Sequence, residues 1–165
     1  MTKSKELIYR RTHGRLSILL LLAMARVAWP QTAPDFSGLW KQDNDRCQPK
    51  RGGDVTLRIE QKDLAFTVET SIAHGSNFRH AVQKYTTDGK MSISTGADGD
   101  EFHTSIVWSG QSLVFSIEEH EDGRIILSKE TWTLIDHGAA LQRVRERAED
   151  SAKQTLIYLR QAPQT

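Results

Sequence analysis

Hydrophobic and polar residues alternate along most of the chain after its first third, which is the pattern of strands with one buried face. The segment 54–69 is an example, because Val55, Leu57 and Ile59 alternate with polar residues and the pattern resumes after a short polar turn. It predicts a half-buried hairpin. Further strands are predicted at 78–85, 90–94, 104–108, 113–117 and 126–135.

Turn residues separate these segments at short intervals. Asp122-Gly123 lies between two alternating runs, and Asp-Gly favours a tight hairpin turn because both residues tolerate positive φ. Strands that recur every 8–12 residues, without a helical pattern between them, indicate an antiparallel sandwich or barrel. We therefore predict an all-β protein, a single antiparallel meander barrel of about eight to ten strands.

The stretch 139–160 allows two interpretations. Its apolar residues approximate a helical stripe, and it is rich in residues that favour helices. The alternative is a pair of strands at 140–147 and 154–160. We prefer the strands, because a final strand would pair with an earlier one and protect an otherwise open sheet edge.

The first 25 residues have the composition of a secretory signal peptide. Five basic residues precede an apolar run at 16–25, which is too short for a membrane span and ends in Ala23-Met24-Ala25, a small-x-small cleavage pattern. We expect cleavage after Ala25, then a linker at 26–34, a barrel domain at 35–160 and a tail at 161–165. The protein is expected to be exported, to the periplasm or beyond, with no membrane span after cleavage.

Charge separates the leader from the rest of the chain. Residues 1–33 carry six lysines and arginines and one acid, whereas the remainder carries 16 basic and 20 acidic residues. The mature domain is thus mildly acidic, which argues against a nucleic-acid partner. Its one cysteine, Cys47, lies in a polar stretch and cannot form a disulfide within the chain.

A short motif suggests a family. Asp35-Phe36-Ser37-Gly38-Leu39-Trp40 resembles the start of a group of exported bacterial proteins with lipocalin-like barrels, and the likeness extends over roughly 35–160. The resemblance implies a calycin-type fold in which Gly38 and Trp40 are structural residues. It also implies that Trp40 packs at the closed end of the barrel beneath an arginine, for which the candidates are Arg143, Arg145 and Arg160.

The sequence offers no recognisable catalytic motif. Its histidines are scattered singly, without the spacing of zinc ligands, and no nucleophile elbow, phosphate-binding loop or dinucleotide fingerprint is present. We therefore predict no catalytic residues, no metal site and no cofactor. A barrel enzyme that pairs His80 or His103 with a carboxylate across strands remains an alternative.

An eight-stranded barrel has room for packed side chains or for one small ligand. Alternation places Trp108, Phe115 and Trp132 where they could point inward, and we assign them as candidate ligand-binding residues. The predicted function is binding of a small apolar ligand without catalysis, with the oligomeric state left open. The alternatives are an isomerase- or hydrolase-type enzyme and an envelope interaction protein with a solid core.

Overall fold

The computed structural model describes residues 33–96, 99–149 and 153–162, which fold into ten antiparallel strands and one 3₁₀ turn. The strands are β1 (Gly38–Gln42), β2 (Asp54–Lys62), β3 (Ala65–His74), β4 (Asn77–Thr86), β5 (Ser92–Thr95), β6 (Glu101–Ser109), β7 (Ser112–Glu121), β8 (Arg124–Ile135), β9 (Ala140–Arg147) and β10 (Lys153–Arg160). The turn η1 (Asp136–Gly138) joins β8 to β9. The predicted leader and its cleavage site lie outside the described residues.

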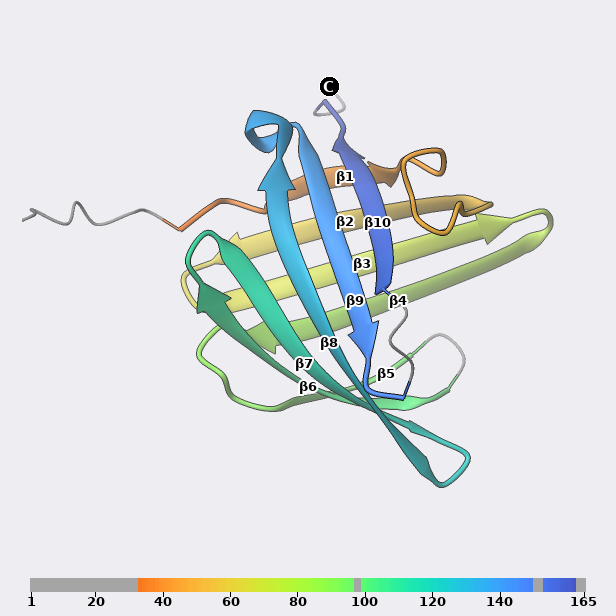
Figure 1. Ribbon diagram of the computed structural model, residues 1–165, viewed down its shortest axis with the longest axis vertical. Helices are drawn as coiled ribbons and strands as arrows, with labels where there is room; N and C mark the ends of the chain where they lie inside the picture. The colour runs from red at the N-terminus through yellow and green to blue at the C-terminus, as the bar shows by residue number, and fades with distance from the viewer. Residues whose placement is uncertain (1–32, 97–98, 150–152, 163–165) are drawn as a thin grey trace, which may run out of the picture. The chain divides into compact units, whose positions relative to one another are not determined.

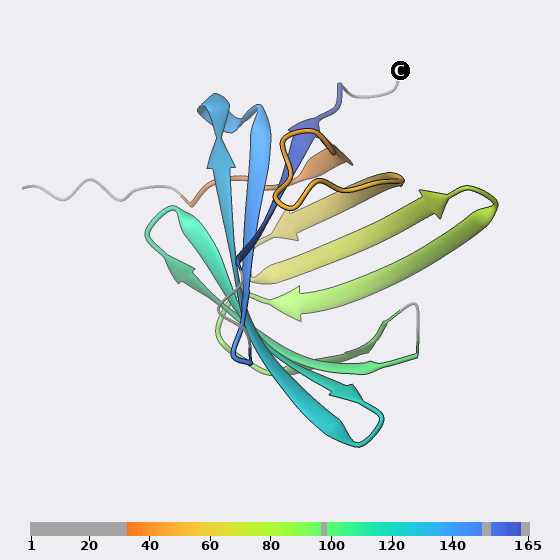
Figure 2. The same ribbon diagram turned by 45° about the vertical axis from the view of Figure 1, so that its right-hand side comes forward.

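The strands form a nearly closed meander barrel (Figure 1). Consecutive strands pair with each other from β1 to β4 and from β5 to β10, and β1 pairs with β10 to join these two runs. In the described part of the chain, β4 and β5 share no ladder, and Figure 2 shows them diverging toward their hairpin tips. The prediction of an all-β antiparallel barrel is confirmed.

The hairpin turns have the predicted backbone chemistry. Asp122 and Gly123 adopt φ values of 48° and 78°, which lets Glu121 pair directly with Arg124. Successive positive φ values match the twist of the flanking strands, so this turn keeps the β7–β8 register. That register matters for function, because it determines which side chains of both strands face the interior.

The C-terminal segment forms strands, as preferred from the sequence. β9 and β10 pair from Lys153–Glu146 to Leu159–Ala140, and the helical alternative is wrong. β10 then pairs with β1 through contacts such as Trp40 with Arg160. Pairing on both sides satisfies the backbone of β10 and removes the edge that a terminal hairpin would otherwise expose.

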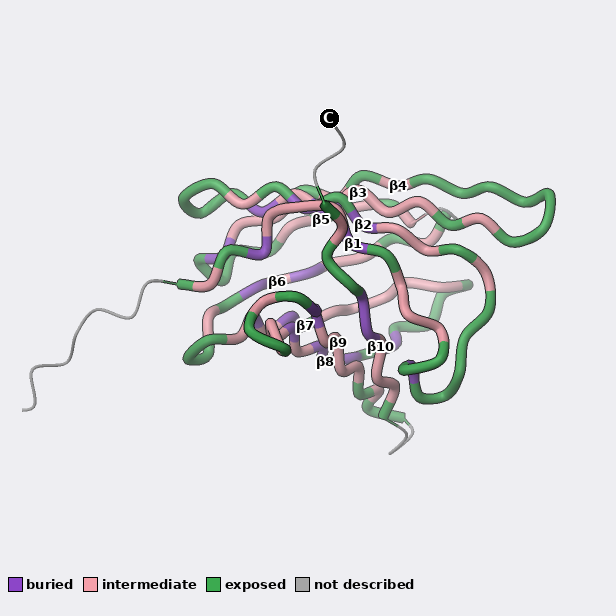
Figure 3. The backbone as a smooth tube through the Cα atoms, turned by 90° about the horizontal axis from the view of Figure 1, so that it is seen from above, coloured by how far each residue is buried: buried purple, intermediate pink, exposed green. Residues whose placement is uncertain are grey.

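The core follows the inward positions of the strands. Figure 3 shows buried stretches in the middle of the strands, whereas most of the β3–β4 hairpin beyond them is exposed. Aromatic rings dominate this core, with edge contacts from Phe66 to Phe36, Phe115 and Trp132 at centroid distances of 5.8–6.2 Å. Such pairs add a modest attraction to the area that each ring buries.

Trp40 packs in the core beneath an arginine. Its side chain is fully buried, and its indole Nε1 donates to the carbonyl of Phe36 at 2.9 Å. Of the three candidate arginines, Arg160 lies over the Trp40 ring, with its guanidinium carbon 4.1 Å from the ring centroid. Gly38 has a φ of +134°, and a Cβ there would lie 3.0 Å from the Arg160 guanidinium.

The loop between β1 and β2 packs against β10. Gln48 and Thr155 exchange backbone hydrogen bonds of 2.8 and 2.7 Å, and the thiol of Cys47 is buried against the backbone of Ile157. Cys47 is therefore part of the packing that holds this loop against β10. Within the described residues, no helix has the length and hydropathy needed to cross a bilayer.

Candidate functional site

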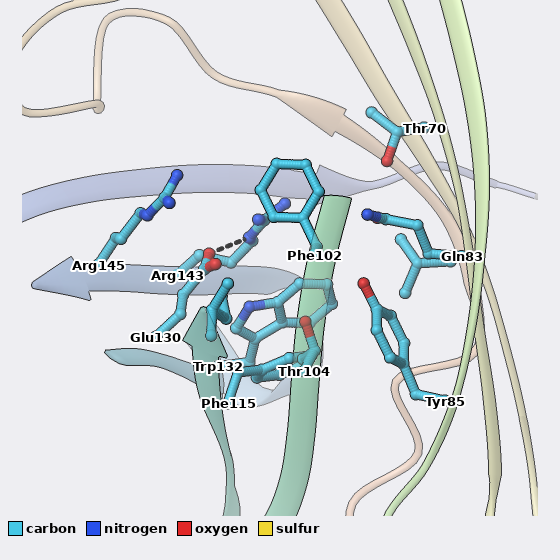
Figure 4. Close-up of a pocket in the computed structure, with 12 residues that line it drawn as sticks. Thr70, Gln83, Tyr85, Phe102, Thr104, Phe115, Glu130, Trp132, Arg143 and Arg145 are labelled. Carbon is cyan, nitrogen blue, oxygen red and sulfur yellow. Dashed lines mark hydrogen bonds and ion pairs between the residues drawn. The ribbon is translucent and has the colours of Figure 1, made fainter. Parts of the chain in front are cut away.

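A cavity lies inside the barrel, between a wall formed by β3 and β4 and a wall formed by β6 to β9 (Figure 4). Its volume is about 130 Å³. It is lined by apolar, aromatic and charged side chains: Val68, Thr70, Gln83, Tyr85, Phe102, Thr104, Phe115, Ile117, Glu130, Trp132, Arg143 and Arg145. A small space that combines apolar walls with a few polar groups is typical of ligand sites.

A second, more open chamber adjoins the first and is lined in part by Arg51 and Gly52 from the connection between β1 and β2. It has a volume of about 440 Å³, and Thr70, Gln83, Phe102 and Arg143 line both spaces. Ligand pockets for small molecules usually occupy about 300–1,000 Å³. The inner cavity alone is below that range, whereas the outer chamber falls within it.

The structure separates the three predicted ligand-binding residues. Phe115 and Trp132 line the inner cavity and stack on each other, with ring centroids 4.6 Å apart. Trp108 packs 6.0 Å from Phe36, outside the residues that line either chamber. The assignment of all three as ligand contacts stays a prediction.

A buried ion pair forms the polar centre of the cavity. Arg143 Nε donates to Glu130 Oε1 at 2.6 Å, and the side chains of both residues are largely inaccessible to solvent. The Arg143 guanidinium also donates to the Tyr158 hydroxyl at 3.4 Å and lies 4.4 Å from the centroid of a Trp132 ring. Figure 4 shows the pair beside the stacked rings of Phe115 and Trp132.

Arg143 stays charged in this environment. Burial opposes the charge of Arg143, but the neighbouring Glu130 carboxylate outweighs it and raises the pKa of the guanidinium. Burial also raises the pKa of Tyr158, so its hydroxyl remains a neutral partner. Removing one member of such a pair would leave an uncompensated buried charge.

Two further polar groups line the cavity: the indole N–H of Trp132, and the hydroxyl of Tyr85, which interacts with the Ser94 side chain. The indole Nε1 of Trp132 is buried and makes no hydrogen bond to the described residues. On the opposite wall, burial raises the pKa of Tyr85 to about 12, so its hydroxyl stays protonated at neutral pH. Both groups can donate a hydrogen bond to an acceptor placed between them.

Arginine residues dominate the outer chamber. Arg51, Arg79 and Arg143 line it, and its described lining contains no acidic residue. Arg145, at the rim of the inner cavity, is paired with Glu119 at 2.9 Å. The positive charges of the outer chamber are therefore partly uncompensated within the barrel, which favours an anionic group there.

The position of Glu130 on its strand marks it as an inward-facing residue. Glu130 lies two residues before Trp132 on the same strand, and residues two apart share a face of a strand. A glutamate on the inward face needs a partner, and the arginines of β9 supply it. Arg143, one of the three candidates for the arginine above Trp40, lies over Trp132 instead.

The histidines suggested for an enzyme lie elsewhere. His80 contacts Glu69 and Ser71, and His103 contacts Glu101, but none of these histidines lines either chamber. The described lining of both chambers contains no histidine or cysteine at all. The cavity therefore lacks the nitrogen and sulfur ligands that zinc prefers.

Comparisons with solved structures show the fold. The chain is similar to a REP1-NXSQ fatty acid transporter, with 14% identity and a TM-score of 0.60 over 78% of this chain and 97% of that one. The structural neighbours are barrels like fatty-acid-binding proteins. The chain has a calycin-type fold.

Two other neighbours have the same fold. Caenorhabditis elegans lipid binding protein 8 is 10% identical, with a TM-score of 0.57 over 76% of this chain and 95% of that one. Zebrafish ileal bile acid-binding protein complexed with cholic acid is 14% identical, with a TM-score of 0.54 over 76% and 98%. No protein-family model and no curated protein sequence matches the chain.

Proposed function

We propose that this protein is an exported barrel that binds one small amphipathic molecule in its interior and performs no chemistry on it. The observation that carries the proposal is the cavity of about 130 Å³ inside the barrel, together with the adjoining, more open space of about 440 Å³. A barrel whose side chains filled its interior would leave no such space. The aromatic wall of Phe115 and Trp132 suits the apolar part of the molecule.

The distribution of charge favours a ligand with an acidic group. Arg51 and Arg79 line the outer chamber together with Arg143, which is already paired with Glu130. A carboxylate or similar anion in this chamber would gain hydrogen bonds to the guanidinium groups that line it. The apolar part would then extend toward Trp132, whose indole N–H has no protein partner.

The names of the structural neighbours are consistent with this class of ligand. They include a fatty acid transporter and a bile acid-binding protein complexed with cholic acid, both of which involve a largely apolar molecule with an acid group. Their sequence identity to this chain is low, so they support the chemical class and not a particular compound.

The proposal that the protein is exported rests on the sequence of its first 25 residues. A basic segment, an apolar run and Ala23-Met24-Ala25 predict cleavage after Ala25. The intact mass of the protein from the envelope fraction of its own host should correspond to a chain that begins at Arg26. A full-length chain in the cytosolic fraction would contradict export.

Ligand binding can be tested by calorimetric titration with dodecanoic acid and with dodecanol, which share a chain and differ in charge. We expect the acid to bind at one site and to bind about tenfold or more tightly than the alcohol. Thr70→Trp should abolish binding, because Thr70 lies where the two chambers meet.

Ser71→Trp is the matched control, because the next residue on β3 faces the outside of the barrel and contacts His80. It should bind the acid as the wild type does. Equal loss in both variants would indicate a folding defect, which circular dichroism would reveal. Equal affinity of wild type and Thr70→Trp would place the binding site outside the barrel, and no binding at all would favour the solid-core alternative.

A further inference from the structure

A second group of polar residues lies on the outer face of the β6–β7 hairpin, away from the cavity. Phe102 and Thr104 point inward and line the cavity, so Glu101 and His103 on the same strand point outward. The register pairs Glu101 with His120 of β7. This group could not be identified from the spacing of residues in the sequence, because the two histidines are seventeen positions apart and come together only through the hairpin.

The side chains of this group are close enough to share one ion. The rings of His103 and His120 are stacked with centroids 4.4 Å apart, and His103 Nε2 lies 2.6 Å from Glu101 Oε1. One ligand atom from each of Glu101, His103 and His120 lies within 4.8 Å of the others. Ligands on a tetrahedral zinc ion are about 3.3 Å apart, so modest side-chain rotations would suffice.

An unpartnered nitrogen points to a missing ligand. His120 Nε2 is inaccessible to solvent and has no hydrogen-bond partner among the described residues. The nearest acid, Glu118, is 3.9 Å away, which is too long for a hydrogen bond. A buried nitrogen without a partner costs roughly 1–3 kcal/mol, so its presence needs an explanation.

We propose that His103, His120 and Glu101 form a binding site for a divalent transition-metal ion, with zinc as the ion of choice. Two imidazoles and one carboxylate are a donor set that holds zinc and leaves a fourth position open. Glu118 lies beside His120 and adds negative charge that would offset that of the cation. The site is independent of the proposed cavity ligand, because it lies on the opposite face of the sheet.

His80 offers an internal comparison. It lies on the outer face of β4, where its Nε2 is 3.5 Å from Glu69 and its Nδ1 is 3.2 Å from the Ser71 hydroxyl. Both of its nitrogens have partners, and no second histidine stacks on it in the described structure. His80 therefore resembles the proposed site in exposure and charge but lacks the second imidazole.

The test is titration of the full chain, without an affinity tag, with Zn²⁺ in the calorimeter and with Co²⁺ by visible absorption. We expect one equivalent of metal per chain, d–d bands of a low-coordinate Co²⁺ site, and reversal by a chelator. His103→Ala and His120→Ala should each weaken Zn²⁺ binding by about 100-fold. His80→Ala should leave the affinity unchanged.

Circular dichroism would show that the variants fold, and Glu101→Gln, which keeps the shape of the side chain, should also weaken binding. Wild-type protein that binds Zn²⁺ no more tightly than the His103→Ala, His120→Ala double variant would overturn the proposal. An equal loss on His80→Ala would do the same, because it would indicate nonspecific binding by surface histidines.

Discussion

Arg160 lies above the ring of Trp40 at 4.1 Å and also donates hydrogen bonds to the backbone carbonyls of Gly138, Ser37 and Asp35. One side chain thereby links β10, the 3₁₀ turn and the segment that precedes β1. This contact fixes the N-terminal residues of the domain against β10.

The first prediction concerns this contact. Arg160→Met should lower the free energy of unfolding by about 1–2 kcal/mol, because it removes an exposed cation–π contact and several charge-assisted hydrogen bonds. Urea denaturation would measure the change. Arg124→Met, which removes an exposed pair with Glu121, is the matched control and should change stability by less than about 0.5 kcal/mol. Equal effects of the two substitutions would contradict the assigned role of Arg160.

The second prediction concerns the glycine of the same motif. Gly38→Ala should destabilise the protein by about 1–3 kcal/mol, since the residue has a φ of +134° and an added Cβ would lie 3.0 Å from Arg160. Gly110→Ala is the control, because Gly110 has positive φ but no atom within 4 Å of an added Cβ.

Combining Gly38→Ala with Arg160→Met separates the two causes. Removing the guanidinium relieves the close contact but not the backbone strain, so the double variant should be more stable than the sum of the single effects predicts. Strict additivity would show that the proximity of Gly38 to Arg160 has no energetic consequence.

The third prediction concerns the buried ion pair in the cavity. Glu130→Leu should cost about 3–5 kcal/mol, because it leaves the charge of Arg143 buried without a partner. The double variant Glu130→Leu, Arg143→Met should recover much of this loss, since it removes both charges. A double-mutant cycle in urea would measure the coupling, and a coupling near zero would argue against a buried pair.

The fourth prediction concerns alkaline pH. Burial raises the pKa of Tyr85 to about 12, so between pH 10 and 12 the phenol is ionised in the unfolded chain but neutral in the folded protein. The unfolded state then binds fewer protons, and stability falls as pH rises. Over this range the free energy of unfolding of the Tyr85→Phe variant should fall by about 2 kcal/mol less than that of the wild type. If the stabilities of the two proteins changed in parallel from pH 9 to 11.5, the raised pKa of Tyr85 would be contradicted.

The hairpins could be predicted from the sequence because local patterns determine them. Alternation identified 54–69 and 126–135 as strand regions, and Asp122-Gly123 identified the turn with its positive φ values. The strand interpretation of 139–160 also depended on a local argument, the need to close a sheet edge.

Contacts between distant strands could not be predicted in the same way. The shear of the whole barrel determines that β4 and β5 share no ladder in the described structure. It also determines which of the three candidate arginines lies above the ring of Trp40. The stacking of His103 on His120 depends on the register of one hairpin, which the turn at Gly110 sets. Alternation was sufficient to place Glu130 inside, but its partner, on β9, could not be identified without the register.

Native mass spectrometry of the protein purified from its own host, with Thr70→Trp prepared in parallel, tests ligand binding most directly. We predict that the wild type carries one small amphipathic acid, released by organic denaturation, and that Thr70→Trp has a bare mass. A wild-type protein that remains bare, and that stays bare when dodecanoic acid is added, would contradict the claim that the barrel holds a ligand.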